Sequence, residues 1–139
     1  MDECIFCAIA SGVASAVRVF EDDNTVAFMD INPATRGHAL VIPKRHARDL
    51  ADVPGPDLQA MAATAHLVGR AAVAGLGAAG VNLMLSSGRA AFQTVFHIHF
   101  HVIPRYSGDG LRLPWIPAPG EPMAVAEAGD LLRSAVRFG

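Results

Sequence analysis

Cysteine, charge and long apolar runs are all scarce in this sequence. The chain of 139 residues has two cysteines, and charged residues make up 17% of it, with a formal net charge of -2. Proteins that bind a nucleic acid polymer through many phosphates present a basic face, so this charge argues against such a partner and leaves open a small phosphorylated ligand. No apolar run reaches the ~20 residues of a membrane-spanning helix, so we expect no membrane association.

The N-terminus lacks the basic and then apolar pattern of a secretory signal, because Met1 is followed by Asp2 and Glu3. We therefore expect a cytoplasmic, reducing compartment. There, the spaced pair Cys4 and Cys7 is more typical of a metal or redox site than of a structural disulfide. No strand–helix–strand pattern follows the pair, which disfavours a thioredoxin-like redox role.

The length fits one domain that can bury a core, and no repeat, low-complexity tract or linker divides the chain. We predict a single domain over residues 1–139, with a core at about 4–105 and a C-terminal arm and helix at about 106–139. Alternating apolar residues predict strands at 17–21, 25–30, 38–43, 81–86 and 94–104. Helical spacing predicts helices at 5–11, 57–73 and 123–136. This order favours an α+β fold with a mainly antiparallel five-stranded sheet, one long helix and a C-terminal helix.

The most informative stretch has histidine at every second position, at His97, His99 and His101. Side chains alternate between the two faces of a strand, so we expect the three imidazoles to share one face, while the apolar residues between them lie on the other. Three interpretations follow: ordinary surface histidines, a three-histidine metal site, or a nucleophile with supporting groups. A neutral imidazole can attack phosphorus when a hydrogen bond to its other nitrogen fixes the tautomer.

The run from Gln93 to Arg105 resembles the signature of the histidine triad family of nucleotide hydrolases and transferases, specifically its small HINT-like branch. Five upstream segments resemble the same family in order and spacing: Ile5-Phe6-Cys7, Phe20-Glu21-Asp22, Ala27-Phe28-Met29-Asp30-Ile31, Arg36-Gly37-His38 and Val41-Ile42-Pro43-Lys44-Arg45-His46. The resemblance covers residues 4 to 105 and implies a fold of the family's type and a homodimer.

The resemblance assigns catalytic roles to the triad segment. It implies that His99 attacks an α-phosphorus and forms a covalent nucleotidyl-imidazole, which water then cleaves. His101 would donate a hydrogen bond to the phosphate or leaving group, and Thr94 would face the same phosphate beside Gln93. His97 would either orient its neighbours or bind metal.

The resemblance also assigns the nucleotide site. Asp30 matches the carboxylate that binds ribose hydroxyls, although a strand-end aspartate can instead hydrogen-bond its own backbone. The walls of the base pocket would be Phe6, Ile9, Phe28 and Ile31, for which plain core packing is the alternative. Two positions depart from the family: Ser86 stands where asparagine is common, and Phe92 where many members have glycine. His38 is predicted to make a structural hydrogen bond.

A second ligand set suits tetrahedral zinc, and closed sites of this kind are structural. By resemblance to bacterial members of the family, it comprises Cys4, Cys7, His46 and His97. Without metal, the cysteines would be small apolar residues of the N-terminal helix.

We therefore predict a cytoplasmic hydrolase that acts on a purine nucleotide such as AMP, as a nucleoside phosphoramidate or a related nucleotidyl adduct. Cleavage of dinucleoside polyphosphates is the nearest alternative. The others are a non-catalytic nucleotide-binding or zinc-stabilised scaffold, and a metal-dependent enzyme with all three histidines as ligands.

Overall fold

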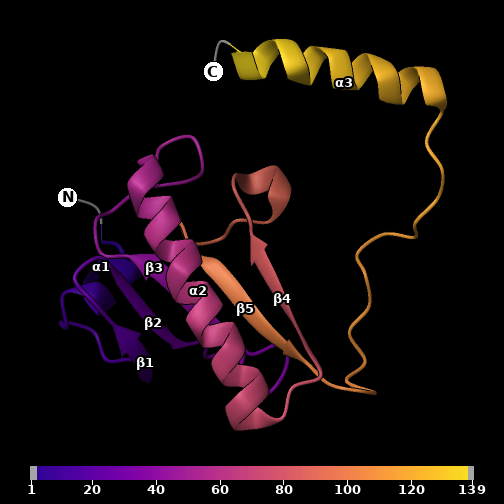
Figure 1. Ribbon diagram of the computed structural model, residues 1–139. Helices are drawn as coiled ribbons and strands as arrows, with labels where there is room; N and C mark the ends of the chain where they lie inside the picture. Colours follow the sequence, from indigo (N-terminus) through magenta and orange to yellow (C-terminus); the bar gives the residue numbers. More distant parts are fainter. Residues whose placement is uncertain (1–2, 138–139) are drawn as a thin grey trace.

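Within residues 3–137, which the computed structural model describes, five strands form one antiparallel sheet with helices on both faces (Figure 1). The strand order is β1-β2-β3-β5-β4, so β1 and β4 are the edges. The strands are β1 (Arg18–Glu21), β2 (Thr25–Met29), β3 (Ala39–Pro43), β4 (Gly80–Leu85) and β5 (Phe100–Arg105). The helices are α1 (Ile5–Ala10), α2 (Gly55–Leu76), the 3-10 turn η1 (Arg89–Ala91) and α3 (Pro122–Arg137). The predicted α+β fold is confirmed.

The central strands β2 and β3 are buried on both faces, and their alternation separates two cores. Ala27, Ala39 and Val41 pack with Met61 and Ala65 of α2. The opposite face packs against α1, through the side chains of Phe6, Ile9, Val26, Phe28, Leu40 and Ile42. The sheet therefore divides the molecule into an α2 side and an α1 side.

The predicted fifth strand begins later than expected. We predicted 94–104, but the ladder starts at Phe100, and residues 94–99 are irregular. The N–H of Ile98 donates to the carbonyl of Ala47 at 2.8 Å, which anchors this segment to the loop after β3 instead of extending the sheet. Ile98 and Val102 are fully buried on the α2 side, as predicted. Phe6 of α1 contacts the rings of both His97 and His99, with 6.0 Å and 5.1 Å between centroids, and the ring of His101 lies 4.9 Å from that of His99. The three imidazoles therefore lie on the α1 side of the sheet, as predicted.

The C-terminal part stands apart from the sheet. After β5, an extended arm leads to α3, which Figure 1 shows separated from the body of the protein. No residue of α3 is buried within the described part of the chain. None of the helices described is both long and apolar enough to span a membrane.

Candidate functional site

A cavity of about 450 Å³ opens on the α1 side of the sheet. It brings together most of the residues predicted to bind nucleotide: Phe6, Ile9, Phe28, Asp30, Ile31, Thr94, His99 and His101. The apolar wall is ordered by aromatic contacts, since Phe6 meets Phe28 edge to face with 5.4 Å between ring centroids. Ile31 lies at the rim, 91% exposed. The cavity is thus apolar at one end and carries two imidazoles and a carboxylate at the other.

The ring of His99 is held by the backbone of its own segment. Its Nδ1 lies 2.8 Å from the carbonyl oxygen of His97, and a carbonyl can only accept, so Nδ1 carries the proton. In the neutral ring, Nε2 then keeps its lone pair. The ring is buried against Phe6, with 5.1 Å between centroids. His99 is therefore held in the tautomer whose Nε2 is unprotonated.

A chain of hydrogen bonds also assigns the tautomer of His101. The N–H of Ala34 donates to Nδ1 of His38 at 2.9 Å, which leaves the proton of His38 on Nε2. That Nε2 lies 2.9 Å from Nδ1 of His101, which must accept. Nε2 of His101 therefore carries a proton and is a donor. The two triad histidines of the cavity are thus complementary, one with a lone pair and one with an N–H.

His38 is the functional residue whose partner sequence reasoning missed. Its predicted role was a structural hydrogen bond, but that bond is made to His101. It lies directly before β3 and one residue after Gly37, whose φ of +88° would strain a residue with a Cβ. Leu40 pairs with His101 across β3 and β5, and it also lines the cavity. The Arg36-Gly37-His38 segment was the available signal.

Asp30 makes the backbone hydrogen bond that was the alternative to ribose binding, and the ribose contact stays a prediction. One oxygen, Oδ1, accepts from the N–H of Asn32 at 2.8 Å, as a turn aspartate does. The other, Oδ2, lies 3.4 Å from Nε2 of His38. The side chain still lines the cavity. The carboxylate is therefore fixed in place with one oxygen next to the histidine chain.

The electrostatics keep the cavity histidines neutral. Burial lowers the pKa of His99 and of His38 below the ordinary histidine value. Burial, then the neighbouring rings of His99 and His38, lower the pKa of His101 to about 4. Asp30 opposes these shifts but does not reverse them. At neutral pH the site therefore presents uncharged imidazoles.

These shifts predict acid sensitivity. An unfolded histidine takes up a proton near pH 6.5, whereas folded His101 resists protonation down to about pH 4. The free energy of unfolding is therefore expected to fall as the pH falls from about 6.5 to about 4. Urea titrations across this range should show a shallower decline for His101→Gln than for the unmodified chain. Carboxylates and other histidines titrate in both proteins, so parallel curves would contradict the assignment.

The loop before the triad segment is held by Gln93. Its Oε1 accepts from the N–H of Gly88 at 2.7 Å, and its Nε2 donates to the carbonyls of Arg48 and Val95. Gln93 and Ser86 are not among the residues described as lining the cavity. The side chain of Gln93 thus shapes the loop that presents Thr94.

Phe92 has the backbone conformation that glycine prefers. It ends η1 with a φ of 69°, the left-handed region, and it is 85% exposed. A residue with a Cβ is strained there by about 1–2 kcal/mol. This explains why glycine suits the position, and the Phe92 ring adds an exposed aromatic surface there.

The second predicted cluster is assembled from three segments: the start of α1, the loop after β3 and the triad segment. Nδ1 of His97 lies 3.4 Å from the Sγ atoms of both Cys4 and Cys7, and 3.2 Å from Nδ1 of His46. The Sγ of Cys7 lies 3.3 Å from Nδ1 of His46. Tetrahedral zinc with ordinary bond lengths separates its nitrogen and sulfur ligands by about 3.3–3.8 Å. The spacing of these donor atoms therefore fits a zinc ion.

The hydrogen bonding of His97 supports the same fit. Its Nε2 lies 2.8 Å from the carbonyl of Pro43, so Nε2 carries the proton and Nδ1 directs a lone pair at the cluster. A backbone carbonyl on the far nitrogen is the usual support of a metal-binding histidine. Burial and Cys4 raise the pKa of the Cys7 thiol to about 11, so the thiolate is unfavourable there without a cation. A bound metal ion would stabilise the thiolate. His97 is therefore placed with the cysteines, away from the ligand cavity.

Comparison with known proteins settles the family. Residues 11–108 match the family model described as HIT domain. The chain belongs to the HIT domain family. Among HIT proteins, adenosine 5'-monophosphoramidase hnt1 of Schizosaccharomyces pombe is 35% identical over 135 residues, which cover 96% of this chain and 98% of the relative. The resemblance inferred from the triad segment is thereby confirmed.

Solved HIT structures cover nearly the whole chain. SMU.412c from Streptococcus mutans UA159 superposes with a TM-score of 0.91 at 30% identity, over 98% of this chain and 87% of that one. A zinc-bound histidine triad family protein from Mycobacterium smegmatis has a TM-score of 0.76 at 48% identity, over 97% of this chain and 94% of that one.

Proposed function

We propose that this HIT protein hydrolyses a nucleotide adduct at its α-phosphate, with a nucleoside phosphoramidate or a related nucleotidyl compound as substrate and His99 as nucleophile. The observation that carries the proposal is the hydrogen bond from Nδ1 of His99 to the carbonyl of His97, which leaves Nε2 unprotonated in the cavity. The 35% identity to a phosphoramidase over nearly the full length supports the substrate class.

The reaction proceeds in two displacements. Nε2 of His99 bonds to the α-phosphorus as the bond from phosphorus to the leaving group breaks, which gives a nucleotidyl-imidazole. The N–H of His101 donates a hydrogen bond to the phosphoryl oxygen or leaving atom on which charge develops. A water molecule then attacks the phosphorus, releases the nucleotide and restores neutral His99. The leaving group takes a proton from solvent as it departs, and the attacking water returns one proton to solvent in the second step. Over both steps, water therefore supplies the hydroxyl of the nucleotide and the proton of the leaving group.

The nucleoside is expected to bind along the apolar end of the cavity. The rings of Phe6 and Phe28 provide the wall for the base, and Ile31 covers the rim. Asp30 then accepts hydrogen bonds from ribose hydroxyls, and Thr94 faces the phosphate.

Changing Asp30 tests the ribose contact. Asp30→Asn is expected to raise KM for an adenosine phosphoramidate about 10-fold or more, because a hydrogen bond to a charged group contributes roughly 1.5–3 kcal/mol. For the matched substrate that lacks ribose hydroxyls, the variant and the unmodified protein should have similar KM values. Steady-state kinetics on both substrates measures this. An equal loss on both substrates would instead indicate that Asp30 acts by positioning His38 and its neighbours, not by binding ribose.

The proposed chemistry is tested by trapping the intermediate. The protein is mixed briefly with an adenosine phosphoramidate, quenched in acid and analysed by intact mass. We expect one added nucleotidyl group, which peptide mapping places on His99. Binding of AMP without turnover or adduct would instead indicate a nucleotide-binding scaffold.

The zinc site is proposed to be structural. Four protein donors from Cys4, Cys7, His46 and His97 fill a tetrahedral coordination sphere and leave no open position for substrate. Zinc there would cross-link α1 to the loop after β3 and to the triad segment. Thiolate ligands stay reduced in the cytoplasm, which we propose as the compartment.

We also propose that residues 1–139 form one domain that acts as a homodimer. The edge strand β4 exposes about half of the side chains of Leu83 and Met84. An exposed apolar edge strand invites pairing with another chain, and β4 of a second copy would cover it.

A further inference from the structure

A cavity of about 680 Å³ opens beside the residues proposed to bind zinc. Three of the four, Cys4, Cys7 and His46, line it, together with Glu3, Ile5, Arg48, Thr94, Val95 and Phe96. Both cysteines are half-buried, and His46 is exposed. Solutes as small as water or a peroxide therefore have a path from solvent to the two sulfur atoms.

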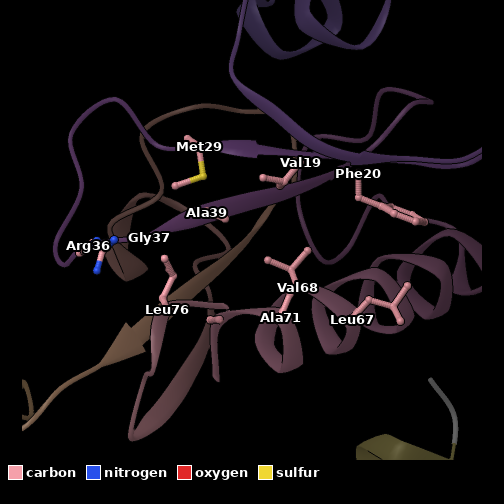
Figure 2. A pocket seen from close by; sticks show the side chains of 11 residues that line it. Val19, Phe20, Met29, Arg36, Gly37, Ala39, Leu67, Val68, Ala71 and Leu76 are labelled. Carbon is pink, nitrogen blue, oxygen red and sulfur yellow. The ribbon is translucent and has the colours of Figure 1, made fainter. Parts of the chain in front are cut away.

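The cavity between α2 and the strands β1 and β2 offers a contrast. It has a volume of about 630 Å³, and its walls are formed almost entirely by apolar side chains. Figure 2 shows these side chains pointing toward one another, with the sulfur of Met29 among them. A thioether cannot form a disulfide, and its oxidation adds an oxygen atom instead. Met29 is therefore a source of background oxidation, which differs in mass from a change at the cysteines.

The two cysteines lie on one helical turn. The N–H of Ala8 donates to the carbonyl of Cys4 at 3.0 Å, so the first turn of α1 includes Cys4. The N–H of Cys7 donates to Sγ of Cys4 at 3.3 Å, which keeps that sulfur over the same turn. Residues three apart on a helix have Cα atoms about 5 Å apart, within the range that disulfides span. The two Sγ atoms lie within 4.8 Å of each other, so rotation of the side chains can join them.

A bond between these two sulfurs would dismantle the zinc site. Zinc binds cysteine as the thiolate, and the sulfurs of a disulfide no longer carry that charge. His46 and His97 would then be the only donors left of the four. The disulfide would close a loop within a single helical turn, so it could not replace a cross-link between α1, the loop after β3 and the triad segment. Oxidation would therefore cost the protein both its metal and that cross-link.

We propose that Cys4 and Cys7 form a site of reversible oxidation, where a peroxide converts the two zinc-binding thiolates to a disulfide and the zinc is released. The inference rests on the proposed zinc site and is independent of the proposed reaction at His99. The chain has no third cysteine, so within one chain each sulfur has a single possible partner.

The peroxide is the oxidant, and the two sulfurs supply the electrons. One thiolate attacks a peroxide oxygen, the O–O bond breaks, and a sulfenic acid forms as hydroxide leaves. The other sulfur then attacks the sulfenic sulfur, so that the S–S bond forms, the S–O bond breaks and a second hydroxide leaves. Two protons from solvent convert both hydroxides to water. The sulfurs thus lose two electrons, and the peroxide gains them.

Titration of the zinc-loaded protein with hydrogen peroxide tests the proposal. A chromogenic chelator reports free zinc, and intact mass with peptide mapping identifies the product. We expect one zinc released per chain, a chain that is lighter by two hydrogen atoms than the reduced zinc-free chain, and a disulfide between Cys4 and Cys7. A dithiol reductant with added zinc should restore the starting protein.

The matched control is Cys4→His, which keeps four donors but only one sulfur. It cannot close a disulfide within the chain, so at the same peroxide concentration it should release zinc at least several-fold more slowly. Thermal unfolding gives a readout that does not depend on this variant. The oxidised chain should have the same lowered midpoint as the reduced chain after chelation, and reduction with zinc should bring the midpoint back.

Several results would overturn the proposal: zinc that stays bound in excess peroxide, zinc released without a disulfide, an unchanged midpoint after oxidation, or equal release rates from Cys4→His and the unmodified chain. A chain that holds no zinc before peroxide is added would overturn the zinc site and this inference together, and the metal content of the starting sample identifies that case. None of these readouts involves turnover, so a failure here is distinct from a failure to trap the intermediate on His99.

Discussion

Replacing His99 with alanine is expected to lower kcat by about 10⁴-fold or more, with little change in affinity for AMP. The variant loses the nitrogen that forms the bond to phosphorus, and water must then attack directly without a covalent intermediate. The apolar walls and Asp30 remain, so binding is preserved. Quenched activity assays on an adenosine phosphoramidate measure kcat, and calorimetric titration with AMP measures the affinity.

Two further variants guard this result against misfolding. His99→Gln retains more of the side-chain volume against Phe6 and should be equally inactive. His66→Ala, at an exposed position of α2, should keep full activity. Turnover by His99→Ala close to that of the unmodified protein would remove His99 from the chemistry and with it the proposed two-step displacement.

Removing zinc is expected to destabilise the protein without removing its activity at low temperature. Three segments that are distant in the sequence meet at Cys4, Cys7, His46 and His97, so the ion would act as a cross-link. Metal binding of this kind contributes directly to folding free energy. We expect chelation to lower the midpoint of thermal unfolding by about 10 °C or more, which corresponds to several kcal/mol in a domain of this size.

The double variant Cys4→Ser with Cys7→Ser serves as the control. It should have the lower midpoint already, and a chelator should not lower it further. Metal content by mass spectrometry confirms the loading of each sample. If chelation abolishes turnover while the midpoint stays the same, the metal takes part in catalysis. That result would favour the alternative in which all three triad histidines bind the metal.

Sequence periodicity predicted the layers of the fold well because it reflects burial. Alternation along 25–30 and 38–43 located β2 and β3, whose side chains do separate into two cores. The same rule failed from Thr94 to His99, where the pattern alternates but the backbone is held by Ala47 and Gln93 instead of a neighbouring strand. Such anchors are tertiary contacts, and no local pattern encodes them.

The sequence predicted most residues of the candidate site but not the hydrogen bonds between them. The resemblance to the triad family supplied the ligand set of the metal cluster and the walls of the cavity. It did not indicate that His38 bonds to His101, since these residues are 63 positions apart and meet only through the pairing of β3 with β5.

The protonation of the two cavity histidines has its origin in peptide groups. The N–H of Ala34 begins the chain through His38 to His101, and the carbonyl of His97 orients His99. Position 34 is exposed and its methyl group has no evident task. Serine or lysine there should leave the hydrogen bonds unchanged. Proline has no N–H, so His38 could adopt the other tautomer, and the direction of the hydrogen bond between His38 and His101 would be reversed. Tolerance to mutation at this site thus depends on an amide hydrogen that no survey of side chains would detect.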